Sequence, residues 1–88
     1  MRLDKFLKVS RLIKRRSLAK EIVEQNRVKV NKHIAKPSAN IKVGDEIEIT
    51  FGRSIVTLKV LDVKEHVKKE EATQLYEVIK EEKMNLDE

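Results

Sequence analysis

The 88-residue sequence has no cysteine, only two glycines and one proline, and few aromatic residues. Without cysteine it has no disulfide framework, no thiol nucleophile and no zinc ribbon. The three aromatic residues, Phe6, Phe51 and Tyr76, are too few for an RNA-binding sheet that stacks bases on aromatic rings. Charged residues make up 40% of the chain and interrupt every apolar stretch, which argues against a secretory or membrane-spanning segment. We therefore expect one small cytoplasmic domain with a thin, aliphatic core and no membrane contact.

The sequence also lacks the patterns of a catalytic or cofactor-binding site. His33 and His66 are far apart in the chain with no cysteine near them, so we expect no metal site. Gly44 and Gly52 are the only glycines, and they do not form a glycine-rich loop for phosphates. No serine has the neighbouring base and orienting group that a nucleophile needs. We expect no enzyme activity, no cofactor and no small-molecule substrate.

Basic residues are concentrated in the first part of the chain. Residues 1–36 contain twelve Lys or Arg and three acids, a net charge of +9, whereas residues 37–88 contain eight and twelve, a net charge of −4. The densest run is Arg-Leu-Ile-Lys-Arg-Arg at 11–16. A basic half on a small domain is typical of proteins that bind a polyanion, most often nucleic acid. A merely solvated surface is the alternative, and the charge pattern alone does not separate the two.

The N-terminal apolar pattern predicts two short helices. A basic connector at 10–16 separates them, and Ser17 is suited to cap the second helix, which Gln25-Asn26 would end. Helices this short need a sheet to pack on. The first helix is expected over residues 2–10, because apolar residues with the spacing of one helical face occur at Leu3, Phe6 and Leu7.

The middle of the chain alternates between apolar and polar residues, and the end is acidic. From residue 68 the pattern changes, because Ala72, Leu75 and Ile79 suit one face of a helix over residues 70–82. We therefore predict an α+β fold, in which two short N-terminal helices pack on a small, curved, mostly antiparallel sheet and an acidic C-terminal helix or tail follows. Strands are expected at 28–30, 34–35, 46–51 and 55–63, with turns at 31–32 and 52–53.

Five short segments, in this order, resemble a known RNA-binding module. They read Arg2-Leu3-Asp4-Lys5-Phe6-Leu7, Arg16-Ser17-Leu18-Ala19-Lys20, Arg27-Val28-Lys29-Val30-Asn31, Lys36-Pro37-Ser38 and Val43-Gly44-Asp45. The module is the RNA-binding domain first seen in small-subunit ribosomal protein four. The resemblance implies an RNA-binding domain over residues 1–66, with its core motif at 1–50 and a sheet hairpin at 46–63, followed by an acidic helix or tail at 67–88.

Among stand-alone forms of this domain, the chain resembles heat-shock protein fifteen and, more closely, the family of ribosome-associated quality control protein P (RqcP). The start Met1-Arg2-Leu3-Asp4-Lys5 and the tail residues Lys68-Lys69-Glu70-Glu71-Ala72 and Leu75-Tyr76 carry this likeness. The family implies binding to rRNA and tRNA on large ribosomal subunits that still carry peptidyl-tRNA. Its partner there is the quality-control factor RqcH, which recruits alanyl-tRNA, and together they add a C-terminal alanine tail to the stalled chain. Off the ribosome we expect a monomer.

Arginine suits RNA phosphates because its planar guanidinium donates two hydrogen bonds at once. Arg2 and Arg16, at the starts of the two expected helices, are the leading RNA-binding candidates. Arg16 also gains from the free amides and positive helix end beside Ser17. Asp4 could hold Arg2 or Lys8 in position, or could simply be an acid favoured at a helix N-terminus. The other candidates lie on the connector, both helices and the first strand: Arg11, Lys14, Arg15, Lys20, Lys5, Lys8 and Lys29.

The sequence departs from the family pattern at Asn26 and Lys32, where glycine is common. Asn26 can adopt the same left-handed conformation at the helix end, so we expect no loss there. Lys32 is less suited than glycine to a positive φ, so we expect the turn after Asn31 to differ in type. Neither position changes the basic candidates.

Three other functions remain open. The chain could be a general recycling or assembly factor of the large subunit, although its acidic C-terminal segment differs from the basic extension of heat-shock protein fifteen. It could be a DNA-binding helix-turn-helix regulator, although its basic residues precede the second helix instead of lining one exposed face. It could also be a protein-interaction module that uses the acidic tail.

Overall fold

The computed structural model describes residues 1–83, and its N-terminal part forms the two helices that the apolar stripes predict. Helix α1 spans Leu3–Val9 and helix α2 spans Arg16–Glu24. The apolar side of α1 is completely buried, whereas α2 buries only two of its side chains, Ala19 and Val23. Both helices therefore use a narrow stripe to pack and leave their remaining faces to solvent.

The start of α2 differs from the prediction by one residue. The helix begins at Arg16 with Arg15 as its N-cap, and no side chain caps this end, so the prediction that Ser17 is the cap is wrong. The connector is anchored by the buried Ile13, and the amide of Ala19 already donates to the carbonyl of Arg15 at 3.0 Å. This anchoring brings the chain into helical conformation before Ser17, although a serine favours the cap position locally.

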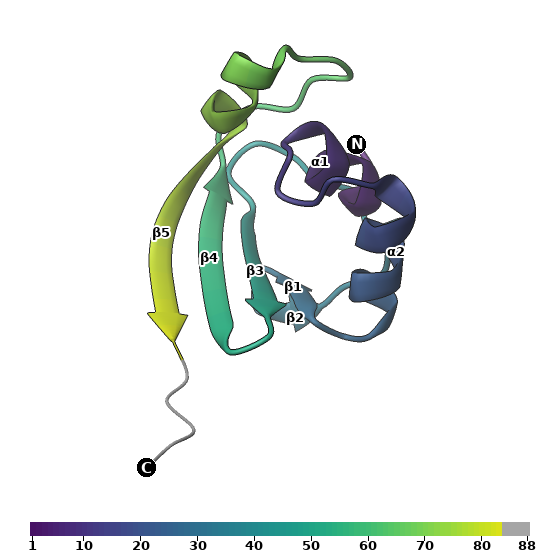
Figure 1. Cartoon of the computed structure of the whole chain (residues 1–88), viewed down its shortest axis with the longest axis vertical. Helices are drawn as coiled ribbons and strands as arrows, with labels where there is room; N and C mark the ends of the chain where they lie inside the picture. The colour runs from purple at the N-terminus through teal and green to yellow at the C-terminus, as the bar shows by residue number, and fades with distance from the viewer. Residues whose placement is uncertain (84–88) are drawn as a thin grey trace.

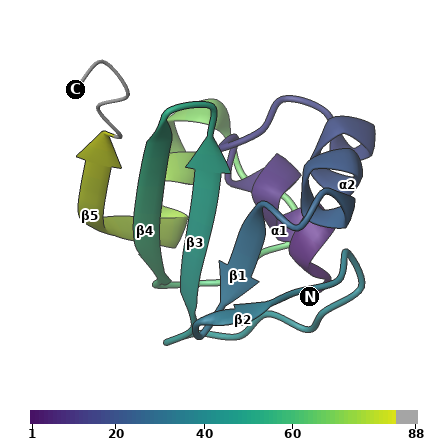
Figure 2. The same cartoon turned by 90° about the horizontal axis from the view of Figure 1, so that it is seen from below.

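Five antiparallel strands form one sheet, and both helices lie on the same side of it (Figures 1 and 2). The strand order is β2-β1-β3-β4-β5, so the first strand of the chain lies inside the sheet. This architecture confirms the predicted α+β class and the antiparallel sheet. The strands are β1 (Val28–Val30), β2 (His33–Ile34), β3 (Glu46–Phe51), β4 (Ser54–Val60) and β5 (Tyr76–Lys83).

The core lies between the helices and the near face of the sheet. Phe6 is the one completely buried aromatic side chain among residues 1–83, so the core is aliphatic as the composition indicates. Strands β1, β3 and β4 alternate, with apolar side chains toward the helices and charged ones such as Lys29, Glu48 and Lys59 on the far face. The sheet contributes these buried side chains: Val28, Ile47, Ile49, Leu58 and Val60.

Three residues other than glycine adopt a positive φ to end α2 and to join β1 to β2. Asn26 has a φ of 61°, and the amides of Asn26 and Arg27 donate to Val23 and Ile22, which is the Schellman helix ending. Asn31 and Lys32 have φ values of 50° and 71°, the pattern of a two-residue type I′ hairpin. Lys32 therefore adopts the left-handed conformation itself, and its less favourable residue type does not prevent a turn of this kind.

The C-terminal segment does not form the helix expected over residues 70–82. A short 3-10 helix, η1, spans Lys69–Leu75, and the chain then continues as strand β5 along the edge of β4. Ala72 and Leu75 are buried as expected, but Ile79 lies at a bulge in β5 and is 53% exposed. The helix prediction is wrong because the free edge of β4 needs hydrogen-bond partners, which a strand supplies and a helix does not.

Candidate nucleic-acid interface

The first residues of the chain are fixed against the segment that precedes β3. The terminal ammonium of Met1 donates to Asn40 Oδ1 at 2.9 Å, and the amide of Ile41 donates to the carbonyl of Met1. On the other side of Arg2, the amide of Leu3 donates to the carbonyl of Ala39 at 2.8 Å. These bonds hold the backbone of Arg2 in an extended conformation next to Asn40. The root of the Arg2 side chain is therefore fixed.

Asp4 joins the two leading arginine candidates, although they are fourteen residues apart in the sequence. Its carboxylate is 2% exposed and accepts hydrogen bonds from Arg2 Nε and Nη2, each at 3.2 Å. The same carboxylate forms an ion pair with Arg16 Nη2 at 3.7 Å and accepts the amide of Lys5 at 2.8 Å. We call Arg2, Asp4 and Arg16 the arginine clamp. Of the two roles left open for Asp4, the geometry supports that of holding arginine side chains, with Arg16 in place of Lys8.

The electrostatics of the clamp keep Asp4 ionised. Burial acts to raise the pKa of Asp4, but the hydrogen bonds from Arg2 and the nearby charge of Arg16 outweigh it and hold the pKa below its ordinary value. Both arginine side chains remain about half exposed. Arg2 uses two of its five N–H groups on Asp4, so three are left for a ligand in solvent. The clamp thus presents two oriented guanidinium groups at one place on the surface.

The first turn of α2 adds further anion-binding capacity beside the clamp. Its leading amides have no carbonyl acceptor within the helix, and no acidic residue lies in this turn. Arg15 and Arg16 occupy this end, and both are exposed. The positive end of the helix dipole and two guanidinium groups therefore act in the same direction on an approaching phosphate.

A groove of about 470 Å³ extends from the clamp along α2. It lies between α2 and the loop around Pro37, and three basic residues line it: Arg2, Lys20 and Lys36. Sequence reasoning included Arg2 and Lys20 but missed Lys36 as a binding residue. The signal for Lys36 was present, because it belongs to the Lys36-Pro37-Ser38 segment that carries part of the family resemblance.

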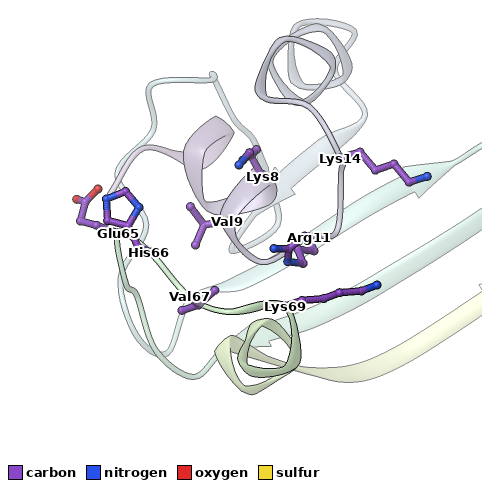
Figure 3. A pocket seen from close by; sticks show the side chains of 8 residues that line it. All are labelled: Lys8, Val9, Arg11, Lys14, Glu65, His66, Val67 and Lys69. Carbon is purple, nitrogen blue, oxygen red and sulfur yellow. The ribbon is translucent and has the colours of Figure 1, made fainter.

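A second basic hollow, of about 450 Å³, lies on the other side of α1 (Figure 3). Lys8, Arg11 and Lys14 line it from α1 and the connector. Lys69 and His66 line it from the segment around η1, which lies close to α1 in the fold. Sequence reasoning missed Lys69, because it stands in a Lys-Lys-Glu-Glu run that reads as part of an acidic tail. We call this hollow the connector cleft.

Two candidates are separated from these groups or already paired. Lys29 projects from β1 on the far face of the sheet and forms an ion pair with Glu48 at 3.7 Å. Lys5 lies on α1, but its ammonium is paired with the carboxylate of Glu65. The structure therefore places Lys29 on the far face of the sheet and Lys5 in an ion pair, whereas the other seven candidates lie on the two helices, at their ends or on the connector.

The arrangement is suited to binding and orienting a polyanion. Lysine and arginine side chains line both hollows, and an arginine side chain can donate two hydrogen bonds at once to phosphate oxygens. Over residues 1–83, no three His, Asp or Glu side chains come together in a way that could hold a metal ion. None of the helices in that range is long and apolar enough to cross a membrane.

Comparison with known proteins identifies the family of this fold and site. The family described as the S4 domain matches residues 1–47. A protein of Halalkalibacterium halodurans named RQC P-site tRNA stabilizing factor is 59% identical over 88 residues, which cover 100% of both chains. The protein of the same name from Bacillus subtilis is 55% identical over 84 residues, which cover 96% of this chain and 98% of the relative.

A solved structure agrees with the sequence relatives. The structure of heat shock protein 15 from Vibrio cholerae, described as trimeric, is 35% identical to this chain, with a TM-score of 0.83. The alignment covers 89% of this chain and 80% of that protein. The ordered motifs around Arg2, Arg16 and Gly44 therefore indicated the family correctly, and the S4 fold carries the clamp on its helical side. The chain belongs to the S4-domain family and, within it, to the family of the RQC P-site tRNA stabilizing factors.

Proposed function

We propose that this protein binds rRNA and tRNA on large ribosomal subunits obstructed by peptidyl-tRNA, and that it holds the peptidyl-tRNA in place there. In this role it acts with an RqcH-type quality-control factor and supports C-terminal alanine tailing of the stalled chain. The names of the relatives support a role at the P-site tRNA. The observation that carries the proposal is the arginine clamp, in which a buried carboxylate fixes Arg2 and Arg16 at the surface.

The clamp explains how a small domain could bind structured RNA without aromatic stacking. RNA helices are recognised mostly through phosphates and 2′-hydroxyls on a fixed shape. A guanidinium that is already oriented loses little side-chain freedom when it meets a phosphate, so more of the contact energy contributes to affinity. The basic residues of the two hollows would then follow the RNA backbone on either side of α1 and α2. This mechanism needs shape and positive charge, and no catalytic group.

The proposal has three further parts. The protein acts as a non-catalytic binding factor, works in the cytoplasm and is a monomer off the ribosome. Residues 1–66 supply the RNA-binding unit, including Arg11, Lys14, Arg15 and Lys20 beside the clamp. The far face of the sheet, where Lys29 is paired with Glu48, is available to contacts other than the main RNA surface.

The test compares binding to purified large subunits with and without peptidyl-tRNA, at two salt concentrations. The proposal expects a clear preference for the peptidyl-tRNA-bearing subunit and a steep loss of affinity with salt. The Arg2→Ala and Arg16→Ala variants should bind at least tenfold more weakly. Arg53→Ala is the matched control, because Arg53 is an exposed arginine in the β3–β4 turn, away from both helices. A loss of alanine tailing with RqcH in the same clamp variants would support the finer role.

A general large-subunit factor is the second candidate, and the similarity to heat shock protein 15 favours it. Equal affinity for subunits with and without peptidyl-tRNA would support this candidate over the tailing role. Tight, sequence-dependent binding to duplex DNA would contradict both, because it would replace RNA as the ligand. Binding that is unchanged by Arg2→Ala and Arg16→Ala would favour a protein-interaction module.

A further inference from the structure

The amino group of Met1 is tied to the segment between β2 and β3, whereas the first residues of most domains are poorly ordered. The ammonium donates to Asn40 Oδ1 at 2.9 Å and to the carbonyl of Ile41 at 3.3 Å. The carbonyl of Met1 accepts the amide of Ile41 at 2.6 Å, and the Met1 side chain packs against the core. Met1 is therefore held by hydrogen bonds to two residues that lie 39 and 40 positions further along the sequence.

The segment that receives Met1 is a firm support. Its residue Ile41 is 1% exposed, and the carbonyl of Ala39 accepts the amide of Leu3 at 2.8 Å. Figure 2 shows the start of the chain beside the loop that follows β2. The two stretches pair in an antiparallel sense, with Arg2 opposite Asn40. Arg2 is thus anchored from both sides, by the bonds of the residue before it and by those of the residue after it.

The anchor before Arg2 has a particular effect on its side chain. The carbonyl of Arg2 accepts the amide of Phe6 at 2.9 Å, so this carbonyl is fixed to α1. Rotation about the Cα–C bond of Arg2 would swing its side chain away from Asp4, to which it donates two hydrogen bonds of 3.2 Å. The bonds of Met1 oppose this rotation, because they hold the chain on the other side of Arg2. The bound amino group therefore helps to keep Arg2 in the clamp.

The chemistry of the amino group makes this anchor sensitive to modification. An ammonium has three N–H groups, and Met1 uses them in two hydrogen bonds to Asn40 and Ile41. A nitrogen that carries a formyl or acetyl group keeps one N–H and loses its positive charge. An acyl group on Met1 therefore cannot leave both hydrogen bonds in place.

We propose that the α-amino group of Met1 is a positioning group of the RNA-binding surface, held by Asn40, and that an acyl group on this amine weakens RNA binding while the fold remains intact. Neither the amine nor Asn40 contacts the RNA in this proposal, because both act through Arg2. The proposal rests on the proposed function, in which RNA is the ligand of Arg2. It adds Asn40, which the charge pattern does not indicate because the side chain is neutral.

The first test compares the affinities of full-length chains for peptidyl-tRNA-bearing large subunits at fixed salt. The chain acetylated at Met1, made by chemical synthesis, and the Asn40→Ala variant should each bind about two- to twelvefold more weakly, since Arg2 must be ordered again on binding. Lys59→Gln is the control for the lost charge, because Lys59 is exposed on the far face of the sheet. Gln74→Ala is the control for the lost amide, because Gln74 is exposed on η1. Acetylated chain that binds as tightly as Lys59→Gln overturns the proposal.

A double-mutant cycle separates positioning from a general structural role. In the Arg2→Ala background, at a salt concentration low enough to measure its binding, acetylation and Asn40→Ala should cost no more than their controls. Losses as large as those in the wild-type background overturn the proposal, because the amine would then act independently of Arg2. Asn40→Ala should also keep the wild-type slope of log K against log salt, whereas Arg2→Ala should lower it by about 0.7–0.9 per phosphate contact.

NMR of the free protein keeps the failure of this inference distinct from that of the proposed function. Acetylation of Met1 should shift the Arg2 Nε–H signal and increase its mobility, while the amides of buried strand residues such as Ile47 keep their positions. An Arg2 signal that acetylation leaves unchanged overturns the inference, whatever the subunits bind. A wild-type chain without preference for peptidyl-tRNA contradicts the proposed function alone, because the same chains can still be compared on either kind of subunit.

Discussion

Replacing Asp4 by asparagine tests the clamp, because two physical effects predict opposite signs. Asp4→Asn keeps the size of the side chain and raises the formal net charge from +5 to +6. If RNA affinity depended only on total charge, the variant would bind more tightly. If affinity depends on the positioning of Arg2 and Arg16, it binds more weakly, because an amide cannot hold two guanidinium groups as a carboxylate does.

The magnitudes decide in favour of weaker binding. Removing one negative charge about 7 Å from a phosphate gains only about 0.6 kcal/mol in water, and salt reduces this further. Releasing two arginine side chains means that each must be ordered again on binding, at about 0.5–1.5 kcal/mol per side chain. The net effect is a loss of about 0.4–2.4 kcal/mol, which is about a 2- to 60-fold weaker affinity.

The assay is equilibrium binding to peptidyl-tRNA-bearing large subunits at fixed salt, with urea denaturation of the free protein alongside it. Asparagine can still accept the amide of Lys5, so we expect the free energy of unfolding to fall by only about 1–2 kcal/mol. Glu77→Gln is the control. Glu77 is exposed on β5, opposite Lys59 of β4, and its replacement by glutamine changes the net charge by the same amount. If Asp4→Asn binds as tightly as Glu77→Gln while remaining folded, the positioning argument is wrong.

The remaining predictions concern stability. The pKa of Asp4 in the folded state is lowered from 3.8, so the ionised carboxylate stabilises the fold fully above pH 3.8. This stabilisation is lost as the pH falls through the folded-state pKa. Urea midpoints of the wild type should therefore fall more steeply below about pH 4 than those of Asp4→Asn. Lys32→Gly should raise the free energy of unfolding by about 0.5 kcal/mol, since Lys32 has a φ of 71°, whereas Lys42→Gly, at a position without a positive φ, should lower it in the same denaturation assay. Leu75→Ala should cost about 2–4 kcal/mol because Leu75 is 2% exposed, and Ile79→Ala should cost under about 1 kcal/mol. If Leu75→Ala and Ile79→Ala lower the free energy of unfolding equally in chemical denaturation, both side chains share one buried face, as in a helix over residues 70–82, and the strand β5 is contradicted.

Local patterns in the sequence determined the helices, most of the strands and the basic side of the protein. The stripe at Leu3, Phe6 and Leu7 and the alternation over 46–51 each repeat with the period of one element, so a few neighbouring residues are enough to identify it. The excess of cations in residues 1–36 indicated a polyanion partner before any fold was known. The ordered motifs then indicated the family, because their order and spacing correspond to the order of the helices and strands in this fold.

Only the tertiary structure decided the C-terminal segment and the grouping of the basic residues. The spacing of Ala72, Leu75 and Ile79 fits a helix as well as it fits η1 followed by a bulged strand, and the unpaired edge of β4 selects the strand. Asp4 could have paired with several cations. The bonds of residues 1–3 to residues 39–41 fix Arg2 beside it, and the packing of α1 against α2 brings Arg16 to it. Lys69 faces Arg11 only because η1 is anchored beside α1. In each case the deciding contact joins residues far apart in the chain, and no local period in the sequence encodes it.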